Sequence, residues 1–101
     1  MGIKIERSSS NIFRDLGFRS EEAESLRIRS ELMIQIRLLI ERRKLTQKAA
    51  AKMFGVSQPR ISDLVRGKIE LFSIDTLVNM LARAKVKVRL QVQRPGRREA
   101  A

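Results

Sequence analysis

Apolar residues recur at three- and four-residue spacing over most of the chain, a pattern typical of amphipathic helices. The longest such stretch, residues 20–43, is expected to form one helix that begins at Ser20, a good N-cap residue. Acidic residues follow this serine, where the helix dipole favours negative charge. The apolar stripe of this helix comprises Leu32, Ile36, Leu39 and Ile40, with Ile28 or Met33 beside it.

Two short helices are expected next, over residues 47–54 and 58–66. Thr46 and Ser57 precede them as N-cap residues. Gly55 lies between them and can adopt the left-handed conformation that a tight turn needs. These residues predict a pair of helices joined by a glycine turn.

A further helix is expected over residues 74–84, with Ser73 as its N-cap and Asp75 in its first turn. Gly67 ends the helix that precedes it. The buried face of this further helix is predicted to comprise Ile74, Leu77, Val78 and Leu81.

The period then changes to strict alternation over residues 85–93, which predicts a half-buried strand. No other strand is expected, and a lone strand cannot satisfy its own backbone groups. Its natural partner is the same strand of a second copy, related by a two-fold axis. The alternatives are that the segment extends the last helix or hangs loose, although valine-rich alternation disfavours a helix. The expected dimerisation residues are Val86, Val88, Leu90 and Val92.

The two ends of the chain have weaker patterns. Residues 1–19 are expected to be a flexible segment with a short apolar element at 12–18, which is either a helical turn docked on the domain or a contact for a partner. The helix-turn-helix domain is expected to span residues 20–84 and the strand 85–93, followed by a disordered basic tail at 94–101.

The charge of the chain points to a polyanionic partner. The formal net charge is +11 on 101 residues. Residues 37–68 hold nine basic and two acidic side chains, a net charge of +7, so the excess is concentrated on the helix pair. Solvated helix faces usually mix charges of both signs, which favours a binding surface over a merely solvated one.

The composition also argues against several kinds of site. The chain has no Cys, His or Tyr, which leaves no thiolate, imidazole or zinc-finger chemistry. We therefore expect no enzyme, cofactor or metal site. There is neither a secretory signal nor an apolar run long enough to span a bilayer, so the expected location is the cytoplasm or nucleoid of a bacterium, with no membrane partner.

The helix pair carries a specific motif. Residues 45–67 follow, without a gap, the pattern L-T-Q-x(3)-A-x(3)-G-V-S-Q-x-x-I-S-x-L-x-x-G. This segment resembles the helix-turn-helix of the lambda-repressor-like family (Cro/cI, or Xre). The resemblance implies an all-α bundle of about four to five helices that places the second helix of the pair in the major groove of double-stranded DNA. The lone C-terminal strand would pair across a dimer, which would bind a pseudo-palindromic operator.

The resemblance also assigns roles to residues. Gln58 would read adenine and Arg60 guanine, because an amide and a guanidinium suit those base edges. Arg66 and Lys68 would bind phosphates of the DNA backbone. Pro59 departs from the polar residue that many relatives carry there, so an apolar contact with a thymine methyl is its expected role. The expected DNA-binding residues are Gln47, Lys48, Ser57, Gln58, Pro59, Arg60, Ser62, Asp63, Arg66 and Lys68.

A narrower resemblance covers about residues 12–92, and the residues that carry it are Phe13, Leu16, Gly17, Gly67 and residues 72–77. It points to HigA-type antitoxins of toxin–antitoxin operons. It implies a dimer that represses its own operon and neutralises a RelE/HigB-like ribonuclease toxin. Glu21, Glu22, Glu24 and Glu31 supply the expected acidic surface for such a basic toxin. The alternative is a stand-alone Xre or phage-type repressor without a toxin.

A third class of function is a basic amphipathic protein that binds membranes or RNA. The chain has no Trp or Tyr, and its four Phe residues are not clustered like a base-stacking platform. This composition favours duplex DNA over RNA or a lipid surface.

Overall fold

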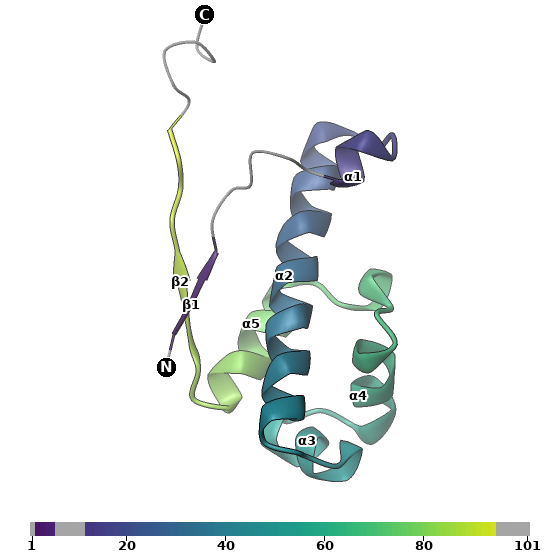
Figure 1. The fold of residues 1–101 in the computed structure, drawn as a ribbon, viewed down its shortest axis with the longest axis vertical. Coiled ribbons are helices and arrows are strands. Elements are labelled where there is room, and N and C mark those ends of the chain that lie inside the picture. Colours follow the sequence, from purple (N-terminus) through teal and green to yellow (C-terminus); the bar gives the residue numbers. More distant parts are fainter. Residues whose placement is uncertain (1, 6–11, 95–101) are drawn as a thin grey trace, which may run out of the picture.

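The computed structural model describes residues 2–5 and 12–94. Helices dominate it, and two short strands lie near the ends of the chain (Figure 1). In chain order the elements are β1 (Gly2–Ile5), α1 (Ile12–Asp15), α2 (Ser20–Arg42), α3 (Gln47–Phe54), α4 (Gln58–Val65), the 3-10 helix η1 (Ile69–Leu71), α5 (Ile74–Arg83) and β2 (Lys87–Leu90).

The long helix α2 is the axis around which the other elements pack. It contacts α1, α4, α5, η1 and β1, while α3 packs on α4 and α5. The stripe expected from the sequence is confirmed as the part of the core that α2 contributes, and Met33 is buried with it. The side chains of the core that are most completely buried are Phe54, Phe72, Leu32, Ile36, Ile61, Leu64, Leu77, Met80 and Leu81.

Three of the four expected helix caps are confirmed. The hydroxyl of Thr46 accepts a hydrogen bond from the Ala49 amide at 3.1 Å. Ser57 accepts from the Arg60 amide at 3.3 Å. Ser73 caps α5 in the same way. These bonds satisfy amides that the first turn of a helix leaves without a partner.

The expected cap of α2 is wrong. Arg19 takes the N-cap position and makes no side-chain capping bond. The Ala23 amide donates to the Arg19 carbonyl at 2.7 Å, so the first helical turn already encloses Ser20. Fully buried Ala23 holds that turn in place.

The buried face of α5 is rotated slightly from the expected one. Leu77 and Leu81 are fully buried as predicted, whereas Ile74 and Val78 are half-buried. Met80 takes a buried place that the sequence pattern did not assign.

The C-terminal strand is confirmed, but the expectation that no other strand exists is wrong. Strand β1 pairs with β2 in parallel, with Gly2 opposite Lys87 and Ile5 opposite Leu90. The expected flexible N-terminal segment therefore includes a strand. Its remaining residues before α1, like residues 95–101 of the expected tail, lie outside the described part of the chain.

The apolar element near the N-terminus forms α1, which packs on the first part of α2. Phe13 is half-buried, and its ring meets that of Phe18 edge to face, with centroids 6.2 Å apart. Ile12 and Leu16 are exposed. The element is thus docked on the domain and still presents apolar side chains outward.

Helix α5 ends in a turn that forces a lysine into the left-handed region. The amide of Lys85 donates to the Ala82 carbonyl and that of Val86 to the Leu81 carbonyl. This pair of bonds is the Schellman motif, and it gives Lys85 a φ of 61°. A side chain in this conformation costs energy that glycine avoids.

We therefore expect Lys85→Gly to stabilise the fold by about 1 kcal/mol, a net value that allows for the greater freedom of glycine in the unfolded chain. Urea denaturation measures the change. The control is Lys87→Gly, which places glycine inside β2 and should destabilise the fold. A loss of stability with Lys85→Gly would contradict the strain argument.

Candidate nucleic-acid interface

The two helices α3 and α4 meet at a turn that requires glycine. Gly55 has a φ of 70°, and a Cβ on it would lie 2.7 Å from Nε of Arg83. Ala50 and Ala51 are buried on the inner side of α3 and permit close packing. The structure thus confirms the expected helix–turn–helix, with Arg83 covering the turn.

The inner face of α4 is fixed by the core. Ile61 and Leu64 are fully buried, opposite the exposed side of the helix. Phe54 anchors the end of α3, and half-buried Val56 follows the turn. Because these apolar residues fix the rotation of α4 about its axis, they decide which of its side chains face outward.

The expected DNA-binding residues come together on α3, on α4 and on the loop that follows α4 (Figure 1). Seven of the ten are exposed: Gln47, Lys48, Ser57, Gln58, Pro59, Arg66 and Lys68. The other three are half-buried: Arg60, Ser62 and Asp63. Gln58 and Pro59 occupy the first turn of α4.

Asp63 forms an ion pair with Lys68, which follows α4. Its carboxylate lies 3.5 Å from Nζ of Lys68, and the Lys68 amide donates to the Asp63 carbonyl. A partly exposed ion pair of this kind contributes little to stability. Its effect here is to neutralise the one acidic side chain of α4.

Arg60, the expected reader of guanine, makes two contacts within the domain. Its Nη1 donates a hydrogen bond to the Leu71 carbonyl at 3.0 Å. Its guanidinium carbon lies 4.5 Å from the centroid of the Phe72 ring, in cation–π geometry. The side chain is therefore held within the fold, by residues that no local pattern around α4 identifies.

Several cations beside the helix pair were not on the expected list. Lys52 is exposed on α3, and Arg43 and Lys44 lie just before it. Arg43 reaches α3, where its Nη1 lies 3.8 Å from Sδ of Met53. The signal available in the sequence was the high net charge of residues 37–68, which does not say which of its cations flank the pair.

The expected dimerisation residues divide into two groups. Val86 is 3% exposed and belongs to the core of its own chain, and Val88 is half-buried. Leu90 and Val92 are 66% and 81% exposed. These last two offer the most apolar surface to a second copy.

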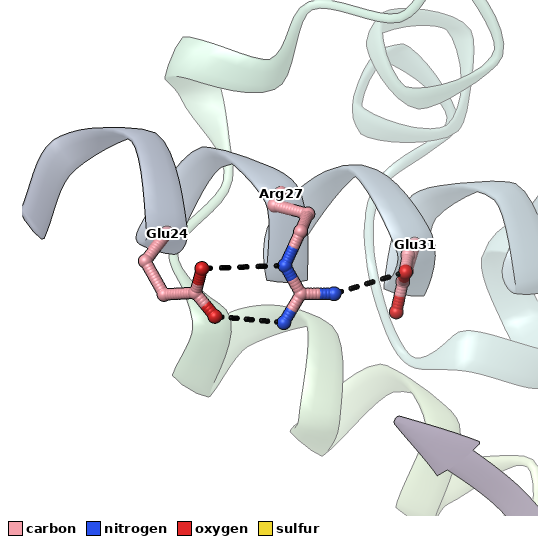
Figure 2. Close-up of polar contacts among 3 residues, drawn as sticks. All are labelled: Glu24, Arg27 and Glu31. Carbon is pink, nitrogen blue, oxygen red and sulfur yellow. Dashed lines mark hydrogen bonds and ion pairs between the residues drawn. The ribbon is translucent and has the colours of Figure 1, made fainter. Parts of the chain in front are cut away.

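The expected acidic surface is partly used within α2. Arg27 is buried between Glu24 and Glu31 (Figure 2). Its Nη2 lies 2.8 Å from Glu24, and its Nη1 lies 3.1 Å from Glu31. The hydrogen bond with Glu24, more than any other contact, raises the pKa of Arg27 above its ordinary value. Glu21 and Glu22 are exposed.

A groove of about 380 Å³ lies between α1, α2, the end of α4 and η1. Half-buried Phe13 of α1 lines it, while Ile12 at the start of α1 and Leu16 directly after α1 are exposed. Its lining residues are Phe13, Ser30, Met33, Ile34, Arg37, Leu64, Gly67 and Ile69.

Across residues 2–5 and 12–94, no helix is long and apolar enough to cross a membrane. The same residues contain no group of three or more acidic side chains placed to hold a metal ion.

The chain was compared with known proteins. A family model described as a helix-turn-helix domain matches residues 12–93. A solved structure whose name places it in the XRE family of transcriptional regulators is similar, with 31% identity and a TM-score of 0.71, over 79% of this chain and 90% of that one. The comparison with curated proteins gives no match. The chain therefore belongs to the Xre-like helix-turn-helix family of DNA-binding transcriptional regulators.

Proposed function

We propose that the protein is a dimeric repressor that reads a pseudo-palindromic site in double-stranded DNA with α4. The observation that carries this proposal is the fixed outward face of α4. Gln58 and Pro59 are exposed in its first turn, while Ile61 and Leu64 hold its other side in the core. In helix-turn-helix proteins the start of the second helix contacts base edges in the major groove.

In the proposed mechanism, different residues contact the bases and the phosphates. The Gln58 amide pairs with N6 and N7 of adenine, and the Pro59 ring packs on a thymine methyl. Gln47 and Lys48, at the start of α3, contact phosphates on one side of the groove. Phosphate contacts of this kind set the register of the protein but carry no sequence information.

Gln58→Ala is expected to relax discrimination at one base pair in each half-site by about 1–3 kcal/mol, because the bidentate amide contact is lost. Binding to duplexes that differ at single positions measures it. Gln47→Ala is the matched control, an amide that contacts phosphate and should weaken all duplexes equally. Unchanged discrimination with Gln58→Ala would remove Gln58 as a reader.

Arg66→Ala is expected to weaken binding to all sequences and to reduce the slope of log K against log salt by about 2, because one phosphate contact disappears from each half-site of the dimer. Arg66 is exposed just after α4. The control is Arg14→Ala, which removes the same charge from exposed α1. Equal slopes for the two variants would contradict a phosphate contact at Arg66.

Dimerisation is proposed through the end of the sheet. Strand β1 already occupies one edge of β2. The second copy would therefore use the other edge of β2 together with exposed Leu90 and Val92. Such a dimer would place two recognition helices about 34–36 Å apart, one turn of B-DNA.

The test is a mobility-shift titration with the duplex that lies immediately upstream of the gene for this protein. We expect this duplex to bind about a thousandfold more tightly than a shuffled one, and binding to both to weaken steeply with salt. Equal affinity for the two duplexes would reduce the protein to a non-specific DNA binder and overturn the proposal.

The second candidate function, compatible with the first, is that of an antitoxin. The groove lined by Phe13 and the exposed Ile12 and Leu16 favour it, since they offer apolar side chains to a partner. Glu21 and Glu22 are exposed at the start of α2 and would suit a basic partner. We propose a RelE/HigB-like ribonuclease toxin as that partner.

Co-expression with the neighbouring reading frame tests the antitoxin function. We expect a small basic protein that co-purifies with the native chain but not with Leu16→Asp, while DNA binding is unchanged. A genome without such a neighbour, or a neighbour that does not bind, would leave a stand-alone repressor.

A further inference from the structure

We propose that Arg60 is a positioning residue that sets the orientation of the first turn of α4, rather than a residue that reads guanine. The inference rests on the proposed DNA-binding function of α4. It assigns specificity at this end of the helix to Gln58 and its neighbours, with Arg60 acting through them.

The guanidinium of Arg60 is held on two sides. Its Nη1 donates to the Leu71 carbonyl at 3.0 Å, which fixes one edge of the group. Its central carbon lies over the Phe72 ring, 4.5 Å from the centroid. Phe72 is 1% exposed and belongs to the core, so the stacking surface is itself rigid.

This contact links the first turn of α4 to another part of the domain. The buried residues of α4, Ile61 and Leu64, lie at the end of its first turn and beyond it. Gln58 and Pro59, which start the helix, are exposed. Arg60 therefore connects the turn that enters the groove to the last residue of η1 and to the residue that follows it. A small rotation of this turn would move the Gln58 amide out of hydrogen-bonding distance of a base.

Reading guanine through the edge that carries Nη1 would cost Arg60 its hydrogen bond with Leu71. A bidentate pair with O6 and N7 uses the same planar fork that now meets Leu71. Lysine retains the charge but has no planar fork to bond a carbonyl and stack on a ring together. Arg60→Lys therefore tests the role of the planar guanidinium group while the positive charge is kept.

The first measurement uses the free protein. Hydrogen exchange at the Ile61 amide, which donates to the Ser57 carbonyl, reports opening of the first turn of α4. We expect about tenfold faster exchange there in Arg60→Lys, with no change in the matched variant Arg66→Lys. Unchanged exchange in Arg60→Lys would overturn the proposal that Arg60 positions the first turn of α4.

The second measurement uses the duplex that the native protein selects from a random library, and all single-base-pair variants of it. We expect Arg60→Lys to reduce discrimination about threefold or more at every base pair that α4 contacts, including the one lost in Gln58→Ala, with the salt slope unchanged. Phe72 is buried and cannot touch DNA. Phe72→Leu should nevertheless cause the same loss of discrimination at every base pair that α4 contacts.

A loss confined to one base pair per half-site, absent from Phe72→Leu, would identify Arg60 as a reader and overturn the proposal. Selection of no sequence by the native protein would overturn the proposed DNA-binding function instead. The exchange measurement distinguishes the two failures, since it needs no DNA.

Discussion

A protein that carries Leu90→Lys and Val92→Lys is expected to be a monomer and to bind its DNA site at least about a hundredfold more weakly than the native dimer, because the two half-sites no longer act together. Both side chains are largely exposed, so the fold itself should be unaffected. The substitutions add positive charge, which by itself strengthens binding to DNA. A loss of affinity therefore reports the loss of the dimer.

The matched control for this variant is Gln91→Lys with Gln93→Lys. It adds the same charge at exposed positions that alternate with Leu90 and Val92. We expect the control to sediment as a dimer and to bind DNA at least as tightly as the native protein. A dimer in both variants would refute dimerisation through the end of β2.

Phe54→Ala is expected to destabilise the domain by about 3–5 kcal/mol, because it removes a fully buried ring and leaves a cavity. Phe54 is 1% exposed and ends α3 in the core that α3 shares with α4 and α5. Native domains are stable by only about 5–15 kcal/mol. The variant should therefore lose much of its cooperative unfolding transition in urea.

The control for this loss is Met53→Ala, the adjacent position on the same helix. Met53 is half-buried, so truncation should cost about 1 kcal/mol. Similar destabilisation by the two variants would contradict the assignment of Phe54 to the centre of the core.

The features of the fold that could be predicted are those with local causes. Thr46, Ser57 and Ser73 cap helices through bonds that span three residues. Gly55 takes the left-handed conformation that closes the turn between α3 and α4. Such features depend on residue type and spacing, so sequence patterns report them directly.

The features that could not be predicted depend on residues far apart in the chain. Strand β1 is four residues long and pairs with β2 near the other end of the chain. The contacts of Arg60 with Leu71 and Phe72 arise because the loop after α4 folds back on it. No periodicity within α4 distinguishes an arginine that points outward from one held in this way.

The central claim is that two copies of α4 read the major groove of one duplex. Methylation interference at guanine N7, an atom in the major groove, tests it most directly on the selected DNA site. The account predicts two clusters of interference centred about 10–10.5 base pairs apart, with little interference from methylation at adenine N3 in the minor groove. A single cluster, or interference mainly from the minor groove, would contradict the account.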